Sequence, residues 1–251
     1  MKKLSLVIPC YNEAKSLEAL TDRALQCAKK RELTPEQFEL VIVDNGSSDG
    51  TDQVIDSLMK GPDKRFLHPV HVEKNQGYGF GLFSGLRAAR GGTLAWTHAD
   101  EQCDPEDVFI AWELQQKRGE KCLVKGRRYE RAFGDMLFSR GFELVAIVLL
   151  GQYVHEINAQ PKVFDASLMK SVTNPPYGFP FDLYVLLKAK EAGMTLESIP
   201  VRFPPRKHGQ SRWASTFRSK FKTIAGMVRF MWDYRRSNTK IGKPLGISTF
   251  L

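Results

Sequence analysis

The feature that most constrains the fold is an alternation of strand and helix patterns over the first half of the chain. Short apolar runs typical of buried strands occur at residues 4–9, 38–44, 70–73, 93–98 and 122–125. Helical patterns lie between these runs, and one of them opens with a capping Asp, then Pro and two acids, at residues 104–107. Strands that alternate with helices predict an α/β fold, with a mostly parallel sheet and helices on both faces.

The positive charge of the chain is concentrated near its C-terminal end. The formal net charge is +9, and residues 202–251 hold 12 of the 37 Lys and Arg but only one of the 28 acidic residues. The remainder of the chain is nearly neutral. This asymmetry indicates a polyanionic partner, either nucleic acid or an anionic membrane surface.

The same basic region contains an amphipathic helical pattern. Its apolar residues follow one another at helical spacing and are Trp213, Phe217, Phe221, Ile224, Met227, Val228, Met231 and Trp232. A helix rich in Lys and Arg with aromatic residues on its apolar face is typical of a helix lying in the plane of a membrane surface. The alternative is a helix docked on the core with a solvated basic face. A nucleic-acid partner is not expected, because it would leave the bulky aromatic residues unexplained.

This pattern predicts one large domain over residues 1–212 and a basic amphipathic membrane-surface segment over residues 213–251. No apolar run approaches the roughly 18–20 residues that span a bilayer. The first residues lack the long apolar region of a signal peptide. The four cysteines show no metal-site spacing, so we expect reduced thiols in a cytosolic protein.

Polar clusters follow three of the predicted strands, at residues 9–13, 44–51 and 98–102. Any one of them alone is typical of a polar turn. Because the carboxyl ends of parallel strands meet at one edge of a sheet, where such folds bind ligands, the three clusters together predict a binding site.

Four segments together resemble the inverting family-2 glycosyltransferases, which have the nucleotide-diphospho-sugar transferase (GT-A type) fold. The segments are PCYNE at 9–13, VDNGSSDGT at 43–51, KNQGYGFGLFSGLRAARGG at 74–92 and HADEQ at 98–102. The likeness extends to the dolichyl- and polyprenyl-phosphate sugar transferases through GRRY at 126–129, SRG at 139–141 and PRKHGQS at 205–211. It implies an enzyme that moves a sugar from a nucleotide-sugar, with inversion, to a polyprenyl phosphate or related lipid-linked acceptor at the cytosolic membrane face.

The resemblance also implies a divalent cation, Mg²⁺ or Mn²⁺, and the residues that hold it. Asp100 and Gln102 match the second acid and the Gln of the family's metal-binding segment, while His98 stands where the first acid is expected. Imidazole suits Mn²⁺ less well than carboxylate does. His98 is therefore either a metal ligand or a side chain packed at the strand end.

The nucleotide-sugar contacts that the resemblance implies come from the same strand ends. They are Pro9, Tyr11, Glu13, Asp44, Asp49 and Asp100. The alternatives for Pro9, Tyr11 and Asp49 are strand termination, aromatic packing and helix capping. The glycines of residues 77–85 are expected to let a helix pack closely on the sheet.

The resemblance implies an arginine at the acceptor phosphate and another at the donor pyrophosphate. A guanidinium group suits this role because it can donate two hydrogen bonds to phosphate oxygens at once. Arg128 and Ser139 match residues expected at the acceptor phosphate, and Arg206 matches a catalytic cation near the donor pyrophosphate. Four residues before Ser139 the relatives carry an Arg, whereas this chain has Asp135. Arg131 is the candidate to replace that Arg at the acceptor phosphate.

The acceptor decides whether a general base is needed. A phosphate monoester, with a second pKa of about 6, is largely a dianion at neutral pH and needs none. The hydroxyl of a lipopolysaccharide or other glycan would need one, and Asp182 is the catalytic candidate; its alternative role is to cap the following helix. A non-catalytic sugar-nucleotide-binding protein is the other alternative.

Overall fold

The structure, a computed structural model, describes residues 2–129, 133–151, 153–204 and 217–239. It divides into two compact units, one comprising Met1–Glu130 and Ala159–His208, the other Arg131–Asn158 and Gly209–Leu251. The expected boundary between residues 212 and 213 lies outside the described residues, so the division at that point stays a prediction.

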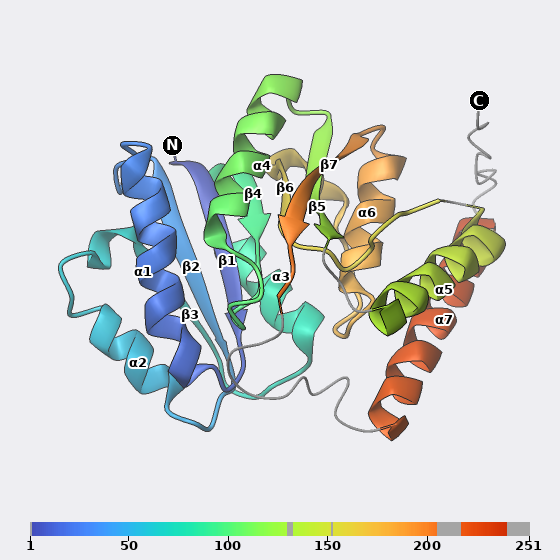
Figure 1. Cartoon of the computed structure of the whole chain (residues 1–251), viewed down its shortest axis with the longest axis horizontal. Coiled ribbons are helices and arrows are strands. Elements are labelled where there is room, and N and C mark those ends of the chain that lie inside the picture. The colour runs from blue at the N-terminus through green and yellow to red at the C-terminus, as the bar shows by residue number, and fades with distance from the viewer. Residues whose placement is uncertain (1, 130–132, 152, 205–216, 240–251) are drawn as a thin grey trace. The chain divides into compact units, whose positions relative to one another are not determined.

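The first unit contains a seven-stranded sheet (Figure 1). Its strands are β1 (Lys2–Cys10), β2 (Phe38–Asn45), β3 (Leu67–Val72), β4 (Gly91–Trp96), β5 (Cys122–Tyr129), β6 (Lys162–Asp165) and β7 (Thr195–Arg202). They lie in the order β3-β2-β1-β4-β6-β5-β7, and only β6 runs antiparallel to its neighbours. The predicted α/β class with a mostly parallel sheet is confirmed, and each of the five predicted strands overlaps an observed one.

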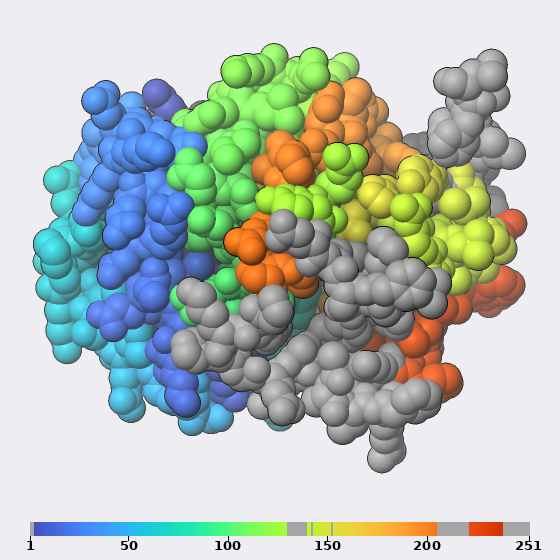
Figure 2. All heavy atoms as spheres, in the orientation of Figure 1, coloured from blue at the N-terminus to red at the C-terminus, as the bar shows by residue number. Residues whose placement is uncertain are grey.

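Helices cover both faces of this sheet (Figure 1). In the first unit they are α1 (Ala14–Lys30), α2 (Thr51–Leu58), α3 (Tyr78–Ala88), α4 (Pro105–Arg118) and α6 (Phe181–Glu191), with short 3-10 helices η1 (Lys64–Phe66) and η2 (Ala166–Ser171). The core on one face joins α1, α2 and α4 to alternate residues of the strands, and includes Leu17 and Ile42. From this side the helices hide much of the sheet (Figure 2).

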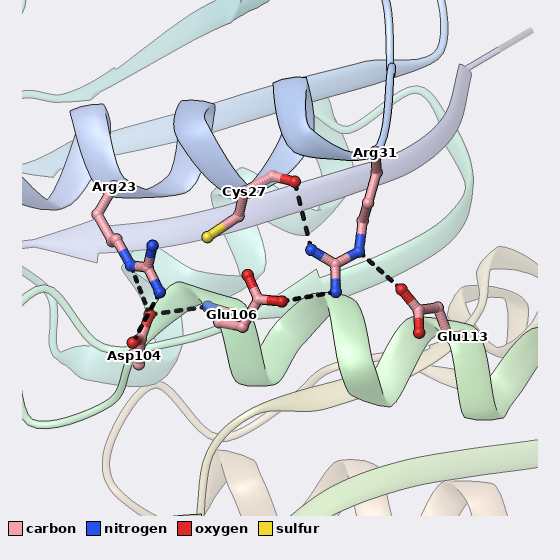
Figure 3. A network of polar contacts seen from close by, with 6 residues as sticks. All are labelled: Arg23, Cys27, Arg31, Asp104, Glu106 and Glu113. Atoms are coloured by element: carbon pink, nitrogen blue, oxygen red, sulfur yellow. Dashed lines mark hydrogen bonds and ion pairs between the residues drawn. The ribbon is translucent and has the colours of Figure 1, made fainter.

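Ion pairs dock α1 against α4 (Figure 3). Arg31 contacts Glu106 at 2.8 Å and Glu113 at 2.7 Å, and Arg23 contacts Asp104 at 3.0 Å. The Arg31 hydrogen bond lowers the pKa of Glu106 to about 2. The N-terminal end of α4 is capped by Asp104, whose side chain accepts from the Glu106 backbone N–H at 2.9 Å. The predicted helix start is thus confirmed.

The glycine-rich segment packs α3 onto the sheet, as expected. A Cβ added at Gly85 would lie 2.5 Å from Val7 Cγ1, and one at Gly79 would lie 2.4 Å from the Pro176 carbonyl oxygen. At Gly77 the backbone has φ +114°, a conformation that favours glycine, and a Cβ there would meet the Tyr177 carbonyl oxygen at 2.4 Å. Any larger residue would push α3 away from its neighbours.

The second unit pairs helix α5 (Phe133–Leu150) with α7 (Phe217–Thr239). Among the side chains of these helices that the structure describes, the buried ones are Glu143, Ala146, Leu150, Met227, Met231 and Tyr234. Arg235 Nη1 donates to the carbonyl oxygens of Val148 at 3.4 Å and Leu149 at 3.2 Å. No helix within the described ranges is long and apolar enough to cross a membrane.

The predicted apolar stripe of the C-terminal helix is divided in the structure. Met227 and Met231 are buried, whereas Phe221, Val228 and Trp232 are exposed by 68, 36 and 50%. Part of the stripe therefore packs within the protein, as the docked-helix alternative expects, and part faces outward. Trp213 lies outside the described residues.

Candidate functional site

Two loops at the carboxyl ends of β1 and β2 are tied together by their own side chains. The Asn12 backbone N–H donates to Ser47 Oγ at 3.0 Å, and the Ser48 N–H donates to Asn12 Oδ1 at 2.8 Å. Because β1 and β2 are adjacent and parallel, their carboxyl ends lie at one edge of the sheet. The first two predicted polar clusters are thus neighbours.

Asp49 joins the starts of two helices at this edge. Its carboxylate accepts from the backbone N–H of Ala14 at 3.1 Å, where α1 begins, and from that of Thr51 at 3.1 Å, where α2 begins. Burial raises the pKa of Asp49, but the hydrogen bonds from Thr51 and Ala14 outweigh it and the net shift is downward. Asp49 thus accepts from the first backbone N–H of each helix, although the N-cap position of α2 itself is Gly50. Contact of Asp49 with a nucleotide stays a prediction.

The other predicted nucleotide contacts, apart from Asp100, lie near the carboxyl ends of β1 and β2 or on the segments that follow them. Asp44 is buried and accepts from the Ser47 N–H at 3.0 Å, while Glu13 accepts from Ser16 Oγ at 3.1 Å. Tyr11 is half-buried. Pro9 pairs with Val43 inside β1, so it does not end the strand.

The segment after β4 holds the predicted metal ligands. Asp100 is buried, and its Oδ1 accepts from the Gln102 N–H at 3.2 Å; Gln102 Nε2 donates to the Pro204 carbonyl oxygen at 2.9 Å. The Asp100 carboxylate and the Gln102 amide oxygen are ligand atoms that suit Mg²⁺ or Mn²⁺, so these two residues fit the implied cation.

A three-residue cluster of possible metal ligands occurs elsewhere. Within the described ranges, only Glu143, His155 and Glu156 of the second unit bring three His, Cys, Asp or Glu ligand atoms together. His155 Nδ1 there lies 2.8 Å from Glu143 Oε1. His98 and Asp100 belong to no such cluster in the part of the chain that the structure describes.

A buried polar network lies beside the predicted site, and the sequence did not reveal it. Lys162 on β6 is fully buried and forms an ion pair with Asp182, which is 2% exposed. Lys162 Nζ also donates to the Ala159 carbonyl oxygen at 3.2 Å and lies 5.4 Å from the centre of the Trp96 ring. Burial lowers the pKa of Lys162, and the Asp182 carboxylate offsets only part of that shift.

Gln160 connects this ion pair to His98. Gln160 Nε2 donates to Asp182 Oδ1 at 2.9 Å and lies 3.3 Å from His98 Nε2. Asp182 lies in the first turn of α6, but the N-cap of that helix is Pro180 and makes no side-chain cap. The capping alternative for Asp182 is therefore wrong.

The predicted phosphate-binding residues are only partly described. Arg128, at the carboxyl end of β5, is half-buried with its guanidinium 5.1 Å from the centre of the Phe203 ring. Arg131 and Arg206 lie outside the described residues. Ser139 belongs to α5, in the second unit, and its side chain also falls outside the description.

Curated relatives match a little less than half of the chain. The undecaprenyl-phosphate 4-deoxy-4-formamido-L-arabinose transferase of Yersinia pestis (strain Pestoides F) is 32% identical over 108 residues, which is 43% of this chain and 32% of that protein. The enzyme of the same name from Yersinia pseudotuberculosis serotype O:3 (strain YPIII) gives the same values. The chain thus matches about a third of the length of these relatives.

Solved structures of similar fold include three glycosyltransferases at low sequence identity. Mannosyl-3-phosphoglycerate synthase from Rubrobacter xylanophilus has a TM-score of 0.69 at 17% identity, covering 94% of this chain and 76% of that one. Glucosyl-3-phosphoglycerate synthase from Mycobacterium tuberculosis, with Mn²⁺, UDP-glucose and phosphoglyceric acid, has a TM-score of 0.67 at 18% identity, covering 93% of this chain and 79% of that one. The mannosyltransferase PcManGT from Pyrobaculum calidifontis, with GDP-Man and Mn²⁺, has a TM-score of 0.61 at 18% identity, covering 82% of this chain and 58% of that one.

These likenesses confirm the GT-A type fold. The family model described as glycosyl transferase family 2 matches residues 5–140, more than half of the chain. That range contains the four segments that carry the resemblance. The chain therefore belongs to glycosyl transferase family 2.

Proposed function

We propose that this glycosyltransferase moves one sugar, with inversion, from a nucleotide-sugar to a polyprenyl phosphate or related lipid-linked acceptor at the cytosolic face of a membrane. Family membership supports the sugar transfer. The Yersinia relatives are named for transfer to undecaprenyl phosphate, which supports a lipid phosphate as acceptor.

The burial and ion pairing of Asp182 favour a phosphate acceptor over a glycan hydroxyl. A glycan hydroxyl needs a general base close to it, whereas a phosphate dianion attacks without one. Asp182 Oδ1 accepts from both Lys162 and Gln160, and the side chain is shielded from solvent. A carboxylate held in this way is poorly suited to receive an acceptor proton, so a phosphate acceptor fits the site better.

The donor would bind along the carboxyl ends of β1, β2 and β4. Glu13 and Asp44 offer carboxylates to ribose hydroxyl or base N–H groups, on loops that Asp49 holds in place. Asp100 and Gln102 would hold a divalent cation, which offsets the charge that builds up on the departing nucleoside diphosphate. Arg128 and Arg206 remain the proposed cations for the acceptor phosphate and the donor pyrophosphate.

The second unit supplies the proposed membrane surface. Outward-facing apolar side chains on α5 are Leu144, Ile147 and Val148, and those on α7 are Phe221, Val228 and Trp232. Lys222, Arg229, Arg235 and Arg236 on α7 are exposed as well. Apolar side chains flanked by cations fit an anionic membrane surface, where the former enter the headgroup region and the latter contact lipid phosphates.

The test is a panel of labelled nucleotide-sugars incubated with undecaprenyl phosphate and Mg²⁺ or Mn²⁺. We expect one donor to yield a lipid-phosphate sugar of inverted configuration. The double variant Asp182→Asn/Lys162→Met, which removes both halves of the ion pair, should retain transfer within about tenfold of wild type, since no general base is lost.

Two outcomes would contradict the proposal. Transfer to a glycan hydroxyl that disappears in the double variant, with donor binding intact, would identify Asp182 as a base. Donor binding without transfer or hydrolysis for every sugar would leave a non-catalytic sugar-nucleotide-binding protein.

A further inference from the structure

The orientation of the Gln160 amide follows from its neighbours. Gln160 is 1% exposed, and one end of its amide lies 2.9 Å from Asp182 Oδ1. Asp182 is paired with the Lys162 ammonium, so its carboxylate accepts hydrogen bonds only. An amide oxygen in that position would be repelled, and the nitrogen of Gln160 must therefore face Asp182.

The same nitrogen determines which form of the His98 ring fits. Gln160 Nε2 lies 3.3 Å from His98 Nε2 and 3.4 Å from Tyr78 Oη, so its second hydrogen is directed toward these two atoms. A ring N–H at His98 Nε2 would set two donors against each other. His98 Nε2 must accept, and the neutral ring then carries its hydrogen on Nδ1.

Tyr78 restricts the ring further. The Tyr78 and His98 rings meet edge to face, with centroids 5.9 Å apart and an interplanar angle of 86°. A tilt of the imidazole plane would lose this contact, and a flip that moved Nε2 would lose the Gln160 hydrogen bond. The ring is thus held on two sides by side chains of the first unit.

We propose that His98 is not a ligand of the divalent cation, and that Gln160 holds its ring with Nε2 as the acceptor and the ring hydrogen on Nδ1. An imidazole binds a metal through the lone pair of its unprotonated nitrogen, and in His98 that lone pair is directed at Gln160. Gln160 is a positioning residue in this scheme, held by Asp182 and Lys162. The inference rests on the divalent cation of the proposed function.

The scheme also accounts for His98 itself, which stands where the family pattern has its first acid. A neutral imidazole in place of the first acid removes one negative charge from the predicted metal-binding segment. The cation would then depend on Asp100 and Gln102, without a nitrogen ligand.

Pulsed EPR of the full-length protein loaded with Mn²⁺ and UDP, and in parallel with Mn²⁺ and GDP, tests the metal part. We expect no modulation from a directly coordinated imidazole ¹⁴N. His98→Asn should leave the Mn²⁺ affinity within about twofold of wild type, and Asp100→Asn should lower it by roughly tenfold or more. A coordinated ¹⁴N signal in wild type that disappears in His98→Asn would overturn the proposal.

Nitrogen NMR of protein labelled with ¹⁵N-histidine tests the positioning part, with the His98 signals identified by their loss in His98→Asn. We expect the Nδ1–H form in wild type and a shift toward the Nε2–H form in Gln160→Met, which keeps the side-chain volume but donates nothing. An Nε2–H form in the wild-type protein would refute the scheme. These spectra need neither donor nor acceptor, so they are independent of whether the sugar panel identifies a transferase activity.

Discussion

Lys162 and Asp182 depend on each other because both are buried. Removing one partner of such a pair leaves an uncompensated charge in a medium of low dielectric constant, which typically costs about 3–5 kcal/mol, whereas replacing both groups together is often nearly neutral. The two residues are 0 and 2% exposed, so solvent cannot replace the lost partner.

We therefore expect Lys162→Met to lower the free energy of unfolding by about 3 kcal/mol or more, and Asp182→Asn/Lys162→Met to recover most of that loss. Urea denaturation of the two variants and the wild type measures it. Equal losses in the single and the double variant would show that the pair is not coupled.

Asp107 is a second residue whose environment disfavours its charge. Burial, and then the neighbouring carboxylates of Asp104 and Glu106, raise the pKa of Asp107 to about 6. Because the pKa of Asp107 is higher in the folded state, its protonated form stabilises the fold. This contribution to stability is complete below the unfolded pKa near 4, and it is lost as the pH rises through about 6.

Asp107→Asn should therefore raise the melting temperature at pH 7.5 by about 2–4 °C, the shift expected for ~1 kcal/mol in a chain of this size. The gain should shrink as the pH is lowered toward 4, where wild-type Asp107 is protonated. Thermal melts over this range measure it, with Asp22→Asn on the exposed face of α1 as the control. A gain that stays constant with pH would contradict the assignment.

At the scale of elements, the docking of α1 on α4 combines apolar packing with the Arg31 ion pairs (Figure 3). The pKa of Glu106 is lowered from 4.5 to about 2 by Arg31. A carboxyl whose pKa is lower in the folded state stabilises the fold above its unfolded pKa, and this contribution is lost as pH falls from about 4.5 to about 2.

Glu106→Gln should thus lower stability at pH 7 by about 1 kcal/mol or more, because Arg31 loses a partner that is only about one-fifth exposed. The difference from wild type should vanish near pH 2. Denaturant titrations at pH 7, 4 and 2.5 measure this trend. The control is Glu36→Gln, which removes the more exposed Arg65–Glu36 pair and should change little.

At the scale of the whole molecule, charge and exposed apolar area are both concentrated in the second unit and the C-terminal region. Residues 202–251 hold 12 Lys and Arg but one acidic residue, so they account for the positive net charge of the chain. Helices α5 and α7 carry outward-facing apolar side chains. Burying one such side chain in an apolar environment contributes about 1.5–3 kcal/mol, which is roughly tenfold or more in affinity.

We expect wild-type protein to co-sediment with vesicles containing phosphatidylglycerol, and Leu144→Ser/Trp232→Ser to bind them at least about tenfold more weakly. Ile110→Ser, which removes an exposed apolar side chain of α4 in the first unit, is the matched control and should bind like wild type. Equal binding by wild type and the double variant would refute the proposed membrane surface on α5 and α7.

How much the sequence revealed changes along the chain. Up to residue 129 the strand and helix patterns follow one another at regular intervals, and the strand-end clusters at Asn12 and Ser47 meet as expected. Beyond that point the pattern fails, because β6 has only four residues and runs antiparallel between β4 and β5. Nothing in its local sequence shows that Lys162 would face Asp182.

The fold class, the family and the edge of the sheet where the donor is expected could all be predicted from sequence patterns. These depend on residues close together in the chain: apolar periodicity, turn residues and strand-end acids. The surroundings of Asp182 and His98, by contrast, depend on contacts that form only in the folded protein. The charge of Asp182 is matched by Lys162, 20 residues earlier, and the His98 ring is held by Gln160, 62 residues later. The burial that makes such partners necessary exists only once the strands and helices have packed.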